Sequence, residues 1–140
     1  MDVEIIRVGP ADAGLFRHVA EDVFDYRIDP AGLADYLVQP GHHLFVALCD
    51  GLVVGQLTAV LHRHPDLRPT ELYMDEVGVS PDYQRRGIAS RLLDAAFTLG
   101  RDLGCAEAWL GTEPDNAAAR GLYRRRADPA EDALIYVFKL

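Results

Sequence analysis

The spacing of the apolar residues changes abruptly after residue 80, and this change constrains the fold more than any other feature of the sequence. Between Leu44 and Val79 the apolar residues form short, β-branched runs that are typical of strands. After residue 80 they recur every three or four positions, which is the spacing of one buried helix face, at Ile88, Leu92, Ala96, Leu99 and Leu103. We therefore expect a strand from Glu71 to Val79 that leads through a loop into a long helix.

Turn residues and helix caps mark the other elements. Asp50-Gly51 joins the runs Leu44 to Cys49 and Leu52 to Leu61, and this dipeptide is a strong signal for an antiparallel hairpin. Asp29-Pro30 is typical of a helix start, because aspartate caps the first turn and proline is tolerated there. Further strands are expected at Val3 to Val8, Ala106 to Gly111 and Ala133 to Phe138, and further helical segments after Pro10 (Leu15, Val19, Val23) and from Pro114 to Arg124.

Together these elements predict a mixed α+β fold of the α/β type, with a central, mostly antiparallel, twisted sheet flanked by about four helices. A chain of 140 residues with 49% hydrophobic content is large enough for one core, so we expect a single domain over residues 1–140. Cys49 and Cys105 lie in separate apolar stretches and form no metal-binding motif, so the sequence predicts no disulfide framework.

The charge of the chain disfavours several classes of partner. It has 22 acidic and 14 basic residues and a net charge of -8, which repels nucleic acid and anionic membrane surfaces, so neither is expected to bind. The N-terminal residues lack the basic flank and apolar run of a signal peptide, and no apolar stretch is long enough to span a bilayer. We expect a cytoplasmic protein. Its oligomeric state stays open, with a homodimer among the states considered.

The segment from Gln84 to Ala89, between the predicted strand and the long helix, has the character of an anion-binding loop. The first N–H groups of a helix have no intrahelical partner and carry a partial positive charge. Gly87 and Ala89 are small enough for a phosphate to approach the backbone, and Arg85 and Arg86 add cationic groups. The segment lacks both the Lys-Ser/Thr pair of a nucleoside-triphosphate loop and the GxGxxG pattern of a dinucleotide fold. A diphosphate of the kind found in coenzyme A is therefore the expected ligand.

The stretch from Glu71 to Leu93 resembles the acetyl-CoA signature of the GNAT family of N-acetyltransferases, whose core is (Q/R)xxGx(G/A) after a strand and at the start of a helix. Gln84, Gly87 and Ala89 occupy the three defining positions. The hairpin before the signature and the elements after it extend the resemblance over nearly the whole chain. The resemblance implies the GNAT fold and acetyl-CoA as co-substrate.

The same resemblance implies where the cofactor lies. Its diphosphate would bind the backbone amides of Arg85, Arg86, Gly87, Ile88 and Ala89. Its pantetheine arm would pair with the main chain of Val77 and Val79, as an additional strand would.

A second group of matching positions is Asn116, Ala119 and Tyr123. Seven residues span about two helical turns, so Asn116 and Tyr123 share one helix face with the small Ala119 between them. The resemblance implies that Asn116 and Ala119 bind the pantetheine arm and that Tyr123 donates a proton or hydrogen bond to the leaving thiolate. A core tyrosine on an amphipathic helix is the alternative interpretation.

Transfer to an amine requires a group that removes a proton from the ammonium form, either a carboxylate or an ordered water. Asp75 and Glu76 are the candidates. A flat strand would place Asp75 on the face of Tyr73 and Val77 and would turn Glu76 away, although the bulge common in this strand of the family alters that alternation. Glu76 is favoured because it directly precedes the residues assigned to pantetheine, and action through water stays open.

The acceptor is expected over the first two helices, where the family binds its amine. Asp22, Asp25 and Asp29, in a segment rich in carboxylates and aromatics, are the expected substrate-binding residues. Within the family the C-terminal half looks most like the aminoglycoside 3-N-acetyltransferase branch. We expect direct attack by a primary amine of a small cationic acceptor, aminoglycoside-like or a polyamine. A protein N-terminal or lysine acetyltransferase and a non-catalytic acyl-CoA-binding domain stay open as alternatives, whereas the charge disfavours an enzyme acting on aminoacyl-tRNA.

His62, His64 and Asp66 have a spacing that would suit a metal ion. They fall in a polar, proline-flanked loop, and the sequence shows no further ligand nearby. The sequence therefore predicts a solvated loop and no metal.

Overall fold

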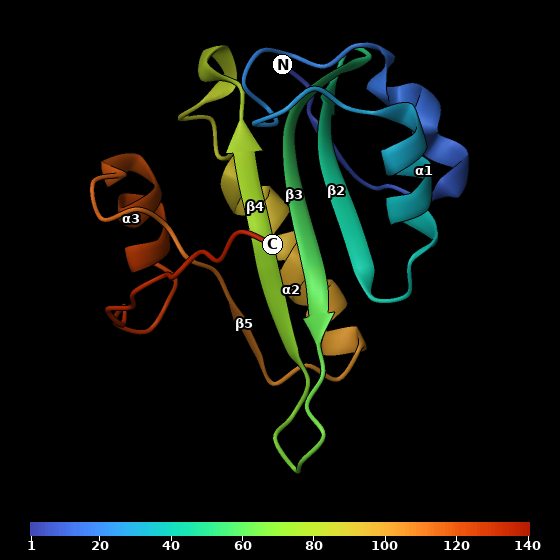
Figure 1. Ribbon diagram of the computed structural model, residues 1–140. Coiled ribbons are helices and arrows are strands. Elements are labelled where there is room, and N and C mark those ends of the chain that lie inside the picture. The colour runs from blue at the N-terminus through green and yellow to red at the C-terminus, as the bar shows by residue number, and fades with distance from the viewer. The chain divides into compact units, whose positions relative to one another are not determined.

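Five strands form one sheet in the computed structural model, which describes residues 1–140 (Figure 1). In their order across the sheet they are β1 (Glu4–Arg7), β2 (His42–Cys49), β3 (Leu52–His62), β4 (Glu71–Val79) and β5 (Glu107–Trp109). The pairs from β1 to β4 are antiparallel, and β5 runs parallel to β4. The predicted mixed, mostly antiparallel sheet is confirmed.

The chain divides into two units, Met1–Leu110 and Gly111–Leu140. The first contains the whole sheet, the 3-10 helices η1 (Pro10–Arg17) and η2 (Pro81–Tyr83), and the helices α1 (Pro30–Val38) and α2 (Ile88–Asp102). The second contains α3 (Ala117–Arg124). No helix combines the length and the apolar character that crossing a membrane would require.

The local signals in the sequence form the structures expected of them. Asp50 and Gly51 have φ angles of 48° and 80°, the left-handed backbone that a two-residue hairpin turn needs. The Asp29 carboxylate accepts a 3.0 Å hydrogen bond from the Gly32 N–H and so caps α1. Helix α2 contains the predicted apolar repeat from Ile88 to Leu99, and Leu103, the last residue of the repeat, is its C-cap, followed by Gly104 with φ of 80°.

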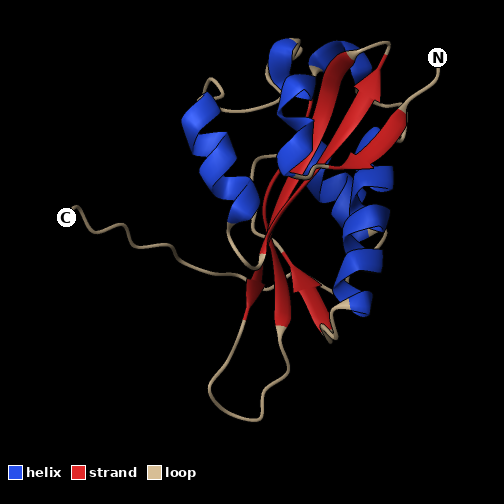
Figure 2. Ribbon diagram, turned by 90° about the vertical axis from the view of Figure 1, so that its right-hand side faces the viewer, coloured by secondary structure: helices blue, strands red, loops and turns tan.

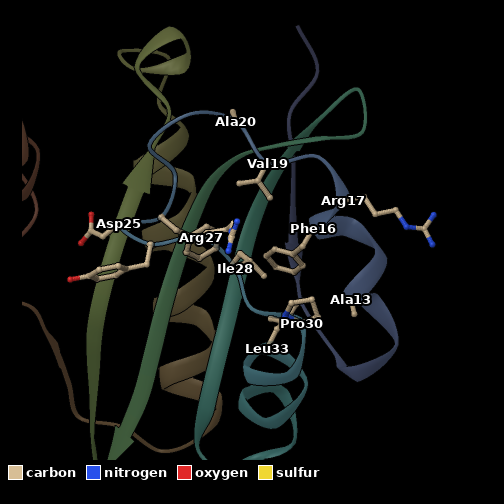
Figure 3. A pocket seen from close by; sticks show the side chains of 12 residues that line it. Ala13, Phe16, Arg17, Val19, Ala20, Asp25, Arg27, Ile28, Pro30 and Leu33 are labelled. Atoms are coloured by element: carbon tan, nitrogen blue, oxygen red, sulfur yellow. The ribbon is translucent and has the colours of Figure 1, made fainter.

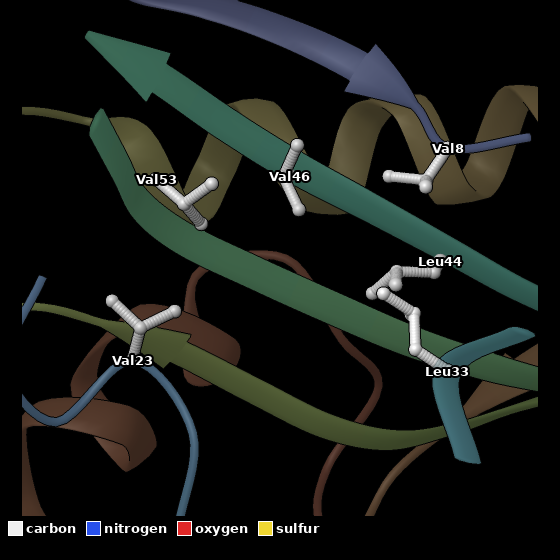
Figure 4. Close-up of a cluster of buried hydrophobic side chains, with 6 residues drawn as sticks. All are labelled: Val8, Val23, Leu33, Leu44, Val46 and Val53. Carbon is white, nitrogen blue, oxygen red and sulfur yellow. The ribbon is translucent and has the colours of Figure 1, made fainter. Parts of the chain in front are cut away.

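Helix α2 and α1 cover opposite faces of the sheet (Figures 1, 2 and 4). Apolar side chains of α2, including Leu92, Leu93 and Ala96, are fully or almost fully buried on one face. The other face carries a cluster of buried side chains that joins the sheet to α1 and to the segment after η1, formed by Val8, Val23, Leu33, Leu44, Val46 and Val53 (Figure 4). Two cores therefore hold the sheet from both sides.

The segment after η1 crosses the sheet in close contact with β3 and β4. The Val23 carbonyl accepts a 3.3 Å hydrogen bond from the side-chain amide of Gln56, and Val23 is 1% exposed. A Cβ atom at Gly78 would overlap with the same carbonyl. The absence of a side chain at Gly78 therefore permits this crossing.

The predicted helix after Pro10 is shorter than its apolar spacing indicated. Leu15 lies in η1, which ends at Arg17, whereas Val19 forms a parallel bridge with Val53. The Val53 N–H donates to the His18 carbonyl, and the Val53 carbonyl accepts from the N–H of Ala20. These bonds to β3 replace the intrahelical ones, and the chain leaves the helix early.

The predicted last strand, from Ala133 to Phe138, does not form. The residues after α3 have no regular structure, and the large apolar side chains of this run are exposed. The run has the composition of a strand, but a strand also needs a neighbour for its backbone groups, and it pairs with none.

Gly78→Ala should destabilise the protein, because the new methyl group must displace the Val23 backbone. Overpacking of this kind costs about 1–3 kcal/mol in the free energy of unfolding. Gly14→Ala is the matched control, since nothing lies within 4 Å of a Cβ at Gly14, and its effect should stay within about 0.5 kcal/mol. Urea denaturation of both variants measures the difference, and equal stabilities would contradict the close crossing.

Candidate functional site

A β-bulge at Asp75 decides which carboxylate of β4 faces the segment after η1. Thr58 pairs with Glu76, and the next residue of β3, Ala59, pairs with Met74, so Asp75 has no partner across the ladder. Glu76 therefore lies opposite Thr58, while Asp75 is exposed at the bulge.

The same register fixes the two faces of β4. Gln56 reaches Val23, and Thr58, two residues along β3, lies on the same side of the sheet. Glu76, opposite Thr58, therefore also faces the segment that contains Val23. A flat strand would have put Asp75 on the side of Tyr73, whereas the bulge puts Glu76 there instead.

The environment of Glu76 suits a proton acceptor. Burial raises the pKa of its carboxyl above the usual value, and the nearby carboxylates of Asp25 and Asp75 add to the rise. Hydrogen bonds from the Asp25 backbone and the Gln56 side chain act on the pKa in the opposite direction. A carboxylate whose pKa is raised toward neutrality takes up a proton more readily in a reaction near pH 7.

A pocket of about 270 Å³ opens beside Glu76. Its lining includes Glu76, Thr58 and Tyr36, together with residues 24–29. The Thr58 hydroxyl is buried and has no hydrogen-bond partner, which is uncommon for a buried polar group. It is therefore available to a polar group of a ligand in this pocket.

Tyr36 has a positioning role in the pocket wall. Its hydroxyl donates a 3.0 Å hydrogen bond to the His43 carbonyl. Burial, with a smaller contribution from Asp75, raises the pKa of Tyr36 to about 12. Tyr36 therefore stays neutral and ties α1 to β2.

A larger pocket of about 600 Å³ lies on the other side of residues 24–28 (Figure 3). Its walls are apolar at Phe16, Val19 and Ile28, with Arg17 and Arg27 in the lining. It contains no residue of β4 and therefore does not include Glu76. Of the two pockets, only the smaller one includes Glu76 in its lining.

The structure brings two of the three predicted acidic residues to these pockets. Asp25 lines both, and Asp29 lines the smaller one while its carboxylate caps α1. Asp22 is exposed in a left-handed turn with φ of 58° and lines neither pocket.

The predicted anion-binding loop connects β4 to α2. Arg85 and Gly87 have φ angles of 62° and 76°, and the Arg91 N–H donates to the Gly87 carbonyl as helical bonding begins. The side-chain amide of Gln84 donates a 3.0 Å hydrogen bond to the Val79 carbonyl and so holds the loop against the end of β4. Nothing lies within 4 Å of a Cβ atom at Gly87, which leaves space beside the helix N-terminus.

The arginines of the loop differ in their surroundings. The Arg86 guanidinium lies 5.6 Å from the centre of the Tyr83 ring and 3.0 Å from the Met1 sulfur. Arg85 is exposed and adopts the left-handed backbone itself. Ile88 is buried and Ala89 half-buried, so these two positions can offer a ligand their backbone rather than their side chains.

The edge of β4 is open along part of its length. Strand β5 pairs with Glu71, Leu72 and Tyr73 only, so the edge from Met74 to Val79 has no strand beside it on that side. Val77 and Val79 lie in this open part. An extended ligand can hydrogen-bond to such an edge as an additional strand does.

Within the unit Gly111–Leu140, Asn116 is the N-cap of α3, and its side-chain oxygen accepts a 3.2 Å hydrogen bond from the Ala119 N–H. Tyr123 lies seven residues later on the same helix, half-buried, and burial raises the pKa of its hydroxyl. The hydroxyl therefore keeps its proton near neutral pH, as a proton donor must.

The sequence analysis missed Thr58, Gln56 and Tyr36. A signal for the first two is present, because they are polar residues two positions apart within the apolar run of β3 and so share one face. Tyr36 carries no comparable signal, since its role depends on where α1 packs.

The model of the acetyltransferase (GNAT) family matches residues 13–127. The N-alpha-acetyltransferase RimI of Mycobacterium tuberculosis is 32% identical over 128 residues, covering 88% of this chain and 78% of that protein. The aminoglycoside N(6')-acetyltransferase type 1 of Salmonella typhimurium is 28% identical over 119 residues, covering 79% and 81%. An uncharacterized N-acetyltransferase of Mycobacterium tuberculosis is 28% identical over 108 residues, covering 77% of this chain, and the match spans 65% of that relative's length.

Solved structures share the fold. An aminoglycoside acetyltransferase from an uncultured soil metagenomic sample, in complex with sisomicin, has a TM-score of 0.81 and 22% identity over 99% of this chain and 95% of that one. A ribosomal-protein-alanine N-acetyltransferase from Brucella melitensis has a TM-score of 0.76 and 23% identity over 99% and 100%. At these identities the likeness shows the fold alone.

Glu76→Gln should remove a pH-dependent loss of stability. Because the pKa of Glu76 is raised in the folded state, its contribution to stability is complete below the unfolded pKa of about 4.3 and is lost as pH rises through the folded pKa. The free energy of unfolding, measured in urea from about pH 4 to about pH 8, should therefore fall further in the parent than in the variant.

Glu21→Gln, which removes an exposed carboxylate outside the two pockets, is the control for this titration and should follow the parent. If Glu76→Gln also follows the parent over the whole range, Glu76 does not have a raised pKa.

Proposed function

Because the chain belongs to the acetyltransferase (GNAT) family, we propose that it transfers the acetyl group of acetyl-CoA to a primary amine. One observation carries the proposal: β4 contributes the carboxyl with the raised pKa to the smaller pocket, and its end leads directly into the anion-binding loop. A single strand thus connects the place for the amine with the place for the cofactor diphosphate. This arrangement supports direct attack of the amine on the thioester.

In this proposal the backbone amides of Arg85, Arg86, Gly87, Ile88 and Ala89 bind the cofactor diphosphate, and the open edge of β4 at Val77 and Val79 binds the pantetheine arm. Gln84 fixes the loop by its bond to the Val79 carbonyl. In the same proposal, Asn116 and Ala119 at the start of α3 also bind the pantetheine arm.

The bound acetyl-CoA supplies an activated thioester. Glu76 takes the proton of the attacking amine, directly or through one water, while Asp75 at the bulge stays in solvent. A carbon–nitrogen bond forms as the carbon–sulfur bond breaks, and Tyr123 donates its proton to the departing sulfur. The raised pKa values of Glu76 and Tyr123 support these two assignments.

We propose a small cationic amine, aminoglycoside-like or a polyamine, as the acceptor. Asp25 and Asp29 at the smaller pocket support this choice, and Asp22 extends the negative charge on the exposed segment. A relative that is named an aminoglycoside N(6')-acetyltransferase supports it further. Four expectations stay predictions: the position acetylated on an aminoglycoside, the homodimer, the cytoplasmic location and the single domain.

A second candidate is acetylation of protein N-termini. The relative with 32% identity over 88% of this chain is named an N-alpha-acetyltransferase, which favours this alternative. The two candidate acceptors differ in the positive charge that the pocket must bind, since an N-terminal amine carries one charge and a polycation carries several.

An acceptor screen separates the candidates. Release of free thiol from acetyl-CoA would be followed with sisomicin, spermidine and short peptides that begin with alanine or contain lysine. We expect kcat/KM for one of the polycations to exceed that of every peptide by about tenfold or more, since multiple exposed ion pairs add about 0.2–1 kcal/mol each. Higher kcat/KM for an alanine peptide would select the second candidate. No turnover with any amine, despite bound acetyl-CoA, would indicate an acyl-CoA-binding domain.

Gly87→Glu should weaken acetyl-CoA binding by at least about tenfold, or 1.4 kcal/mol, because the side chain puts bulk and negative charge into the space beside the helix N-terminus. Gly87→Ala is the matched control, since it shares the cost of a left-handed backbone but adds only a methyl group. Titration calorimetry on both folded variants measures the effect. If the glutamate variant binds as tightly as the alanine variant, the diphosphate lies elsewhere.

Tyr123→Phe should lower kcat by about a hundredfold while the affinity for acetyl-CoA changes little, because it removes only the proton donor. Tyr136→Phe, at an exposed tyrosine of the same unit, is the control and should match the parent. The comparison requires that chemistry limits turnover, which single-turnover kinetics establishes. An unchanged kcat for Tyr123→Phe would make Tyr123 a packing residue.

A further inference from the structure

Two histidines and a glutamate meet at the end of the β3-β4 hairpin that lies farthest from the anion-binding loop (Figure 1). Strand β3 ends at His62 and β4 begins at Glu71, and these two residues are direct partners across the ladder. His64 follows in the connecting loop. The Nδ1 atom of His62 lies 3.6 Å and the Nε2 atom of His64 lies 3.1 Å from the same oxygen of Glu71.

The geometry of this cluster fits a tetrahedral metal site. One ligand atom from each of the three residues lies within 4.8 Å of the others. Zinc bonds of about 2.0–2.2 Å place tetrahedral ligands roughly 3.3 Å apart, and the two separations at Glu71 lie on either side of that value. The limit of 4.8 Å lies above that value, so a rotation of the half-exposed His62 side chain would bring the ligand atoms to bonding distance.

The burial of the cluster argues for a built site. The His64 side chain is only 5% exposed and Glu71 20%, whereas His62 at 53% leaves one side open to solvent. A histidine in this position on a loop is normally solvated, but here the loop folds it against the start of β4. The ring centres of His62 and His64 lie 4.6 Å apart, and each ring has a nitrogen within 3.6 Å of the same Glu71 oxygen.

Asp66, the third possible ligand in the sequence, interacts with Arg68 instead of the histidines. Its carboxylate accepts a 2.9 Å hydrogen bond from the Arg68 N–H and lies 3.6 Å from the Arg68 guanidinium. Glu71 replaces it, because strand pairing brings Glu71 beside His62 across the loop. The expectation of no metal rested on finding no further ligand near the histidines in the sequence, and the hairpin supplies one.

We propose that His62, His64 and Glu71 bind a divalent transition metal of the zinc class. Imidazole nitrogens and a carboxylate oxygen are ligands that suit zinc, and three protein ligands leave a fourth position for water or an external group. On the extended strand Glu71 lies roughly 16 Å from Glu76, at a rise of about 3.3 Å per residue, so the metal stands apart from the proposed reaction. Its effect is to fasten the loop of residues 63–70 to the sheet.

Zinc binding by the chelator-treated full chain tests the proposal. In competition with a chromophoric zinc chelator we expect one Zn²⁺ per chain, and a rise in the midpoint of thermal unfolding on adding Zn²⁺ but not Mg²⁺. His62→Ala, at the exposed ligand, and Glu71→Gln should each weaken binding at least tenfold and remove the thermal shift. His18→Asn, at an exposed histidine outside the cluster, should behave as the parent.

Two ligand variants are used so that the test still gives a result if Glu71→Gln fails to fold. His62→Ala truncates a half-exposed side chain at the end of a strand, and its circular dichroism should match that of the parent. Absence of stoichiometric Zn²⁺ binding in the parent would overturn the proposal and leave the cluster as a hydrogen-bonded closure of the hairpin. Equal affinity in the parent, His62→Ala and Glu71→Gln would assign the zinc to other groups and would overturn it as well. Neither result depends on acetyl transfer.

Discussion

The close approach of the Val23 carbonyl to β4 at Gly78 is the contact on which the arrangement of the site depends. Only a residue without a Cβ atom lets the backbone of the crossing segment come this near, and the Gln56 amide fixes it by a hydrogen bond to the same carbonyl. Residues 24–29 follow directly and form the wall of the pocket beside Glu76. The burial that raises the pKa of Glu76 is thus linked to a backbone contact two residues away on the same strand.

Strand β4 combines three local departures from a regular ladder, and each has a consequence for the site. The bulge at Asp75 turns Glu76 toward the pocket. The short partner β5 leaves the edge from Met74 to Val79 open. The turn after Val79, held by Gln84, directs the N-terminus of α2 toward the space beside Gly87. In a regular strand Asp75 would take the place of Glu76 on the pocket side, and a partner as long as β4 would leave no free edge for a ligand.

Local signals in the sequence predicted the elements well. The Asp50-Gly51 turn, the Asp29 cap and the helical repeat after Ile88 each depend on residues close in the chain, and each forms as expected. Such local signals could not predict features that depend on partners distant in the sequence. Val19 left the helical pattern because β3 offers its backbone a partner, and the run after Ala133 did not form a strand because a ladder needs a neighbour.

The residues of the candidate site show the same difference between local and distant signals. The anion-binding loop and the pair Asp75-Glu76 were found from the sequence, since both lie within a few residues of one strand end. The choice between the two carboxylates required the register of β3 against β4, which one bulge changes. Thr58 in the pocket and Glu71 beside the two histidines emerged only from strand pairing, which joins residues that the sequence separates.

The pH dependence of kcat/KM for acetylation of an amine identified as substrate tests the central claim, that the bulge and the crossing segment make Glu76 the proton acceptor. The parent should lose activity as pH falls through the raised pKa of Glu76. Glu76→Gln should lower kcat/KM by about a hundredfold or more and abolish this acidic limb, whereas Asp75→Asn should retain it. The account would be contradicted if Glu76→Gln kept the kcat/KM and the acidic limb of the parent while Asp75→Asn lost both.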